Sequence, residues 1–273
     1  MKYFKMSLKY LFKETKGFTF LGIFIAFLIP CACIAFAIPI GDFAGNILGT
    51  PTYTNWPDMF ALYFKRPMLL LFLIPGVLFI SAAKALCTSN TMYHFKIGKF
   101  KMTNVFTALN NYFIPSILDI LFNIAIYLAT FILFLVLAYM WNKLFSLSTY
   151  LVFAILTAII LIGIMVYITS AFVLFLPHLS NVGILGHNGI LDAYYLTKHK
   201  MKNLIFIGLF NALVITITAI VLYYLPTYHY VKAIINAVIL DFALTLSFAF
   251  QFVAYYDINN MTREDINSYK GVR

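Results

Sequence analysis

The amino-acid sequence predicts an all-α membrane protein, a polytopic bundle of six transmembrane helices with both termini in the cytoplasm. Three observations lead to this prediction. The 273 residues are 63% hydrophobic and 10% charged, with a mean hydropathy of +0.93, whereas a soluble domain is about a quarter charged. Uncharged apolar runs long enough to cross roughly 30 Å of hydrocarbon recur along the chain. Lysine and arginine gather at alternate ends of these runs.

Six apolar runs define the predicted spans and make residues 1–273 a single transmembrane domain. The third run is too long for one span, and it contains Pro115, which lacks a backbone N–H and disfavours helix just before it. We therefore expect a short helix on the membrane surface up to Phe113 and a tilted span that starts at Pro115. The predicted spans are 18–40, 67–86, 115–140, 150–176, 204–225 and 233–255.

The basic residues predict the orientation, because the cytoplasmic flanks of transmembrane helices carry an excess of lysine and arginine. Fifteen lie on one side, in the N-terminus, the loop after the second span, the segment before the fifth span and the C-terminal tail. The other side has four: Lys65, Arg66, Lys143 and Lys232. This pattern predicts N-in and C-in. We expect these residues to meet anionic lipid headgroups of a bacterial cytoplasmic membrane, and not nucleic acid.

A weak internal repeat suggests how the spans are grouped. "KGFTFLGIF" (16–24) and "KNLIFIGLF" (202–210) open the first and fifth spans, and they share Lys, Phe, Gly and Phe at the same offsets. Chance is the alternative, since short matches arise easily in apolar sequence. The repeat favours three helical hairpins, each preceded by a cytoplasmic interfacial helix whose apolar face enters the acyl boundary.

The polar stretch at 183–203 is one such interfacial element. Asn188 can cap a helix, and the apolar residues after it share a face opposite the polar ones. We interpret the stretch as a cytoplasmic element that contacts lipid or a partner protein through its charged residues, Asp192, Lys198, Lys200 and Lys202. An acyltransferase-like reading of His187 and Asp192 requires a phosphate-binding motif and a folded domain, and neither is present.

No pattern in the sequence predicts catalysis, a cofactor or a metal. There is no H-E-x-x-H, G-x-S-x-G, Walker or dinucleotide motif. The three cysteines fit buried apolar thiols better than a redox or metal site. We therefore expect a protein that is not an enzyme.

The ionisable residues inside the spans carry more information, because a charge at mid-bilayer costs about 2.5–3.5 kcal/mol on insertion scales. Lys84 and Asp119 lie at similar depths in the second and third spans. Two alternatives follow. Lys84 forms an ion pair with Asp119, or it extends to the headgroups by itself.

Asp119 also belongs to a stripe at four-residue spacing, together with Asn111, Pro115, Asn123 and Tyr127. This spacing places the side chains along one side of a helix, where they either bond neighbouring helices or line a cavity. Asp241 stands deep in the sixth span with no basic residue at its depth. A candidate intramembrane polar site therefore contains Lys84, Asn111, Asp119, Asn123, Asn211 and Asp241.

Two stretches resemble a known family. "IPGVLFISAAKALCTSNTMYHFKIGKFKMTN" (74–104) and "FLPHLSNVGILGHNGILDAYYLTKHKMKNLIFIGLF" (175–210) resemble the YesL-like small bacterial membrane proteins. They are also similar to the membrane region of some glycerophosphodiester phosphodiesterases. The resemblance implies an accessory bacterial membrane protein, sometimes linked with sugar uptake, and it transfers no catalytic residue.

Two functions are consistent with these observations. The first is a non-enzymatic accessory or assembly partner of another membrane transport or export system, which implies a membrane-protein partner. The alternative is a small transporter or lipid-handling permease with a polar intramembrane cavity around Asp119 and Asp241.

Overall fold

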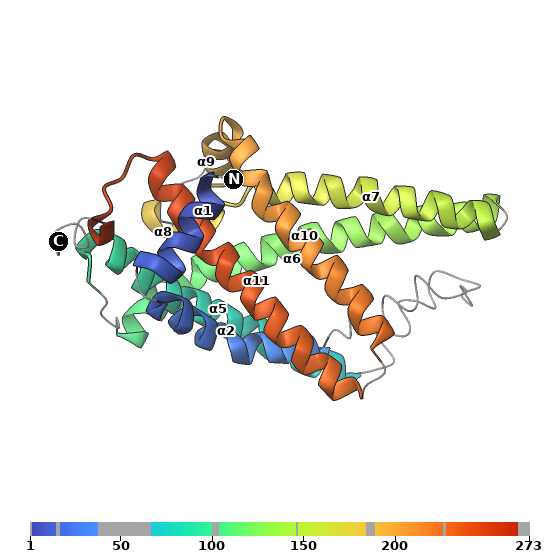
Figure 1. Cartoon of the computed structure of the whole chain (residues 1–273), viewed down its shortest axis with the longest axis horizontal. Coiled ribbons are helices and arrows are strands. Elements are labelled where there is room, and N and C mark those ends of the chain that lie inside the picture. Colours follow the sequence, from blue (N-terminus) through green and yellow to red (C-terminus); the bar gives the residue numbers. More distant parts are fainter. Residues whose placement is uncertain are drawn as a thin grey trace.

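A computed structural model describes residues 2–14, 17–37, 67–99, 104–145, 147–183, 189–225 and 228–266. Every regular element within these ranges is helical (Figure 1). The elements are α1 (Lys2–Leu8), the π-helical segment η1 (Lys9–Glu14), α2 (Phe18–Ala37), α5 (Pro67–Ile97), α6 (Val105–Leu144), α7 (Leu147–Ala171), α8 (Phe175–Val182), α9 (Gly189–Lys198), α10 (Met201–Tyr224) and α11 (His229–Ile258).

Six segments of this helical chain are long and apolar enough to cross a membrane, and they correspond to the six predicted spans. They lie on α2, α5, α6, α7 with α8, α10 and α11. Large apolar side chains are exposed along these helices, such as Ile160 on α7 (62%) and Leu213 on α10 (59%). Such a surface is unfavourable in water and fits the interior of a bilayer, so the fold is that of a multi-pass membrane protein.

One predicted boundary is wrong. The helix does not break at Pro115, because α6 is continuous from Val105 to Leu144. The Asn104 side chain caps its start by accepting a hydrogen bond from the Phe106 amide at 3.0 Å. Pro115 is buried, and a proline removes only one bond from the helical ladder. Packing on both sides of Pro115 therefore holds the helix together.

Two helices end at other residues than the spans predicted on them. The second was predicted to end at 86, but α5 continues to Ile97, because its polar last turns are buried in protein. The fourth was predicted to run to 176, but α7 ends at Ala171, and a turn precedes α8. The Thr197 hydroxyl of α9 donates to the Ala171 carbonyl, which satisfies one of the free carbonyls at the end of α7.

The six long helices pack as a ring in chain order. The principal contacts join α2 to α5, α5 to α6, α6 to α7, α7 to α10, α10 to α11, and α11 back to α2. The described parts of α6 have no comparable contact with α10 or α11. These helices therefore face one another across the interior of the ring.

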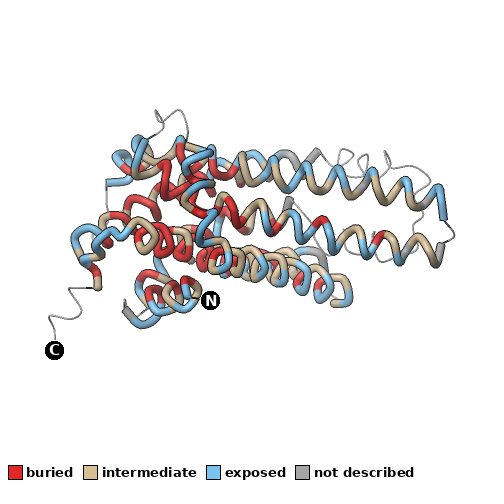
Figure 2. Tube along the Cα trace, turned by 90° about the horizontal axis from the view of Figure 1, so that it is seen from above, coloured by how far each residue is buried: buried red, intermediate tan, exposed pale blue. Residues whose placement is uncertain are grey.

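Burial is concentrated at one end of the ring, which we call the closed end. It contains α1, η1, α8, α9 and residues 259–266, and the buried residues gather there (Figure 2). Phe95 is fully buried between Tyr10 and Tyr256, and the Arg263 guanidinium lies 4.3 Å from its ring centroid. At the opposite, open end, α6 and α7 extend together while α10 and α11 diverge from them (Figure 1).

The N-terminal helix differs from the predicted interfacial helix. Its buried residues Tyr3 and Ser7 face protein, since α1 packs on α11 and α10, and Tyr10 and Leu11 of η1 belong to the same core. The Tyr3 ring meets Phe250 edge-on at 6.2 Å. This face is therefore covered by aromatic side chains of the bundle.

Candidate functional site

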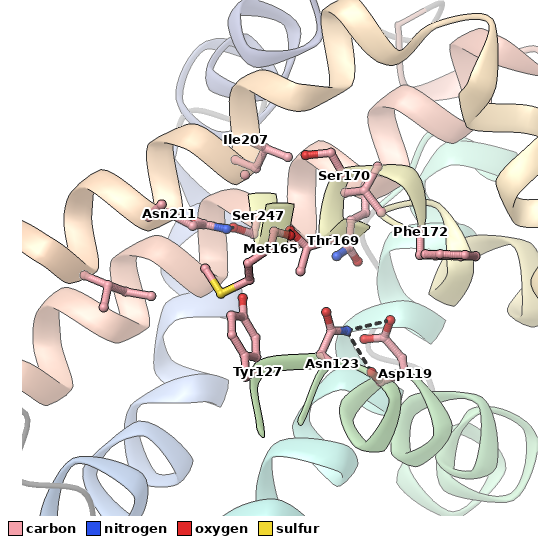
Figure 3. Close-up of a pocket in the computed structure, with 15 residues that line it drawn as sticks. Asp119, Asn123, Tyr127, Met165, Thr169, Ser170, Phe172, Ile207, Asn211 and Ser247 are labelled. Carbon is pink, nitrogen blue, oxygen red and sulfur yellow. Dashed lines mark hydrogen bonds between the residues drawn. The ribbon is translucent and has the colours of Figure 1, made fainter. Parts of the chain in front are cut away.

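A polar cavity of about 60 Å³ lies inside the ring, between α6, α7, α10 and α11. Polar side chains from all four helices point into it (Figure 3). The lining residues are Asp119, Asn123, Tyr127, Met165, Thr169, Ser170, Phe172, Val173, Ile207, Gly208, Asn211, Ala212, Ile215, Ser247 and Gln251. About 10–15 Å³ of such cavity volume is enough for one water molecule, so the cavity has room for roughly four water-sized groups.

A buried ion pair forms one wall of the cavity. Lys84 Nζ of α5 lies 2.6 Å from Asp119 Oδ2 of α6, and their side chains are 10% and 2% exposed. Of the two alternatives for Lys84, the structure shows the ion pair. Two charges removed from water are tolerated only when they are well paired and hydrogen-bonded. Removal of either residue would therefore leave the charge of the other buried without a partner.

Asn123 extends this polar wall by one helical turn. Its Nδ2 donates to the Asp119 backbone carbonyl at 2.7 Å and lies 3.4 Å from Asp119 Oδ1 (Figure 3). The contact with Oδ1 leaves Oδ2 to Lys84, so the carboxylate is held from two sides. The asparagine thus orients Asp119 while it faces the cavity.

Asn211 and Ser247 form the opposite wall. Asn211 Nδ2 donates to Ser247 Oγ at 2.8 Å, which joins α10 to α11. The single hydroxyl hydrogen of Ser247 has two acceptors within reach, the Ala243 carbonyl at 2.7 Å and Asn211 Oδ1 at 3.0 Å. Because one hydrogen cannot fully serve both, Asn211 Oδ1 retains capacity to accept a hydrogen bond from a ligand.

Two further residues that line the cavity have a buried side-chain oxygen without a hydrogen-bond partner among the described residues. Ser170 of α7 is 1% exposed, and its Oγ is unpartnered. Gln251 Oε1 of α11 is likewise buried and unpartnered. Buried polar atoms are nearly always hydrogen-bonded, so each of these two atoms has capacity for a further hydrogen bond.

Gly208 brings α10 close to α7 beside Ser170. An added Cβ at this glycine would lie 2.6 Å from Ser170 Oγ and 3.1 Å from the Val166 carbonyl oxygen. Small residues permit such close approach between membrane helices. The absence of a side chain at Gly208 therefore sets the position of Ser170 at the cavity wall.

The structure gathers some of the predicted site residues and separates others. Asp119, Asn123 and Asn211 line the cavity, and Lys84 reaches it through its ion pair. Asn111 is exposed near the start of α6. Asp241 is fully buried on α11 but does not line the cavity, and its described contact is Thr245 Oγ1 at 3.4 Å.

The contributions of α7 and Gly208 to the cavity were not predicted from the sequence. Thr169 and Ser170 are common residues in an apolar helix that carries no charge, so nothing in their spacing distinguishes them. The Thr169 hydroxyl donates to the Met165 carbonyl at 2.9 Å within its own helix, which is the ordinary behaviour of threonine in membranes. Only their position opposite α6 and α11 makes them part of the site.

The predicted interfacial element contributes α9 at the closed end. Asp192, Lys198, Lys200 and Lys202 are all exposed, and Asp192 Oδ2 lies 4.0 Å from His178 Nε2 of α8. His187 and Asn188 lie outside the described residues. The helix packs inward through Ala193 and Thr197, whereas Ile190, Leu191 and Tyr195 are 47–60% exposed.

Together the fold and the cavity define a class: a multi-pass helical membrane protein with a polar cavity enclosed by its spans. Within the described ranges, no group of three or more His, Cys, Asp or Glu side chains is arranged to hold a metal ion. Comparisons with protein-family models, curated proteins and solved structures found no match for this chain. The resemblance to the YesL-like family therefore rests on the two quoted stretches alone.

Proposed function

We propose that the protein is a small membrane transporter that binds a polar solute or lipid headgroup in the cavity between α6, α7, α10 and α11. The observation that carries this proposal is the pair of unpartnered buried atoms, Ser170 Oγ and Gln251 Oε1, at the wall of a polar cavity. Ionisable residues inside membrane spans, such as Asp119 in this cavity, usually face the bundle interior or a cavity and often mark the path of a substrate.

The uneven packing of the bundle supports a transport role. The closed end is densely packed with aromatic residues, and the helices diverge toward the open end (Figure 1; Figure 2). Helices that pack tightly at one end are compatible with the rocking of one part of a bundle against another, by which many transporters alternate their access.

We also propose that the closed end faces the cytoplasm of a bacterial cell and that the spans form three successive hairpins. The lysine and arginine distribution supports this orientation. An impermeant amine reagent applied to intact cells should label Lys143, which is exposed at the open end of α6. It should label Lys198 on α9 only after lysis. Labelling of Lys198 in intact cells would reverse the orientation.

Flux measurements with two matched asparagine variants test the transport role. In liposomes loaded with a panel comprising a polyol, a small amide, an amino acid and a monovalent anion, Asn211→Ala should lower the flux of the transported solute about tenfold. Asn111→Ala is the control, because Asn111 is exposed on α6 and does not line the cavity. Equal flux through both variants, or no flux above that of empty liposomes, would contradict the proposal.

A role as accessory partner of another transport or export system is the second candidate. The observation that favours it is the outward apolar face of α9 (Ile190, Leu191 and Tyr195) beside the exposed lysines at the closed end. Mild-detergent purification followed by mass spectrometry separates the two candidates. A stoichiometric membrane-protein partner that is lost in Leu191→Ser supports the accessory role, whereas a chain that purifies alone supports the transporter.

A further inference from the structure

We infer that the cavity selects an uncharged group rich in hydroxyl or amide functions, carried by a free polyol or by the headgroup of a neutral glycolipid. This inference rests on the proposed transport function and adds the chemical class of the ligand. Its basis is the combination of a balanced internal charge, unpartnered hydrogen-bonding atoms and a small volume.

The charge balance of the cavity disfavours ions. Among the described residues that line it, Asp119 is the one with a formal charge, and Lys84 neutralises it at 2.6 Å. A cation or anion would find no counter-charge unless it displaced one member of this pair, and it would pay a large desolvation penalty in a low-dielectric site. A neutral ligand avoids both penalties.

The unpartnered atoms match hydroxyl or amide groups. Gln251 Oε1 can only accept a hydrogen bond, and Asn211 Oδ1 competes for a hydrogen that Ser247 also offers to Ala243. Gln251 Oε1 therefore lacks a donor, and Asn211 Oδ1 can accept a second one. The Ser170 hydroxyl can donate or accept. A ligand O–H can donate to an amide oxygen and accept from the serine at the same time, whereas a phosphate or carboxylate offers no donor.

The volume and the arrangement of the helices admit two sources for this chemistry. About 60 Å³ accommodates a small polyol or one part of a sugar ring. Near the closed end α7 and α10 touch at Gly208, and they diverge toward the open end (Figure 1). A free polyol and the sugar headgroup of a neutral lipid both offer hydroxyl groups of this size.

Binding to the purified 273-residue chain shows whether the ligand is neutral or charged, and whether it is a free solute or a lipid. Radiolabelled glycerol and glycerol 3-phosphate form a matched neutral and charged pair for equilibrium dialysis. Nanodiscs that contain monoglucosyl diacylglycerol or phosphatidylglycerol form the lipid pair, read by native mass spectrometry. We expect the neutral member of one pair to bind at least about tenfold more tightly than its charged counterpart.

Variants of the cavity wall test whether this binding occurs in the cavity. Ser170→Ala and Gln251→Leu should each weaken binding of the neutral probe about tenfold. Thr216→Val on α10 is the control, since Thr216 is exposed and bonds only its own helix in the described structure. The melting temperature without ligand shows whether each variant is folded. If one cavity variant does not fold, the other still tests whether binding occurs in the cavity.

The possible results test the ligand class separately from the transport role. Cavity-dependent binding of glycerol supports the inference with a free ligand, and cavity-dependent retention of the glycolipid supports it with a lipid ligand. Equal or tighter cavity-dependent binding of a charged probe overturns the ligand class but leaves the transport proposal intact. If no probe binds while Asn211-dependent flux persists, the inference alone fails; if both are absent, the transport proposal fails too.

Discussion

Asp119→Asn should lower the free energy of unfolding by about 3–5 kcal/mol, because it leaves the Lys84 ammonium buried without its counter-charge. The double variant Lys84→Met/Asp119→Leu removes both charges and should restore stability to within about 1 kcal/mol of the original protein, since well-packed apolar residues often replace a buried pair without loss. Unfolding by denaturant in detergent micelles, followed by circular dichroism, measures both changes.

The Lys2–Asp257 pair provides the matched control. Its atoms lie 2.7 Å apart, close to the 2.6 Å of the buried pair, but its side chains are 56% and 28% exposed. Asp257→Asn should therefore lower the free energy of unfolding by less than about 1 kcal/mol, as is usual for surface ion pairs. If Asp119→Asn were as mild as Asp257→Asn, Lys84 would have to reach water, and the buried pair would not stabilise the bundle.

Gly208→Ala should lower the free energy of unfolding by about 1–3 kcal/mol, the usual penalty for overpacking. The new methyl group would lie 3.1 Å from the Val166 carbonyl oxygen, which belongs to the backbone of α7 and cannot rotate away. It would also lie 2.6 Å from Ser170 Oγ, so α10 must move away from α7 or the serine must turn. Either response alters the cavity, and we expect solute flux to fall together with stability.

Gly163→Ala on α7 is the control for this prediction. An added Cβ at Gly163 meets nothing within 4 Å, so its effect should be limited to helix propensity, a stabilisation of up to about 1 kcal/mol. The same denaturant titration applies to both variants. Equal stability of the two alanine variants would show that α7 and α10 are not held together at Gly208.

Several features followed directly from the sequence. Hydropathy located all six spans, because the free energy of transfer into hydrocarbon depends on composition over about 20 residues and not on their neighbours in space. The depths of Lys84 and Asp119 allowed their ion pair to be considered, since the distance of each residue from a span end fixes its depth. The four-residue spacing of Asp119 and Asn123 placed them on one side of α6.

Tertiary structure decided the rest. Pro115 looked like a helix boundary, but packing on both sides of it keeps α6 continuous. The last turns of α5 are polar, and only their burial among η1, α11 and the C-terminal residues extends that helix to Ile97. In each case the local preference was real, and contacts from distant parts of the chain outweighed it.

The composition of the cavity also depended on the packing of the helices. Asp241 satisfied the same criterion as Asp119, an ionisable residue inside a span, yet it lies outside the cavity. Ser170 and Gln251 are not ionisable, yet both line the cavity. Hydropathy records whether a helix enters the membrane, but the rotation of that helix about its axis is set by packing against its neighbours. The sequence alone therefore determined which segments meet lipid, and only the arrangement of the six helices determined which polar groups meet one another.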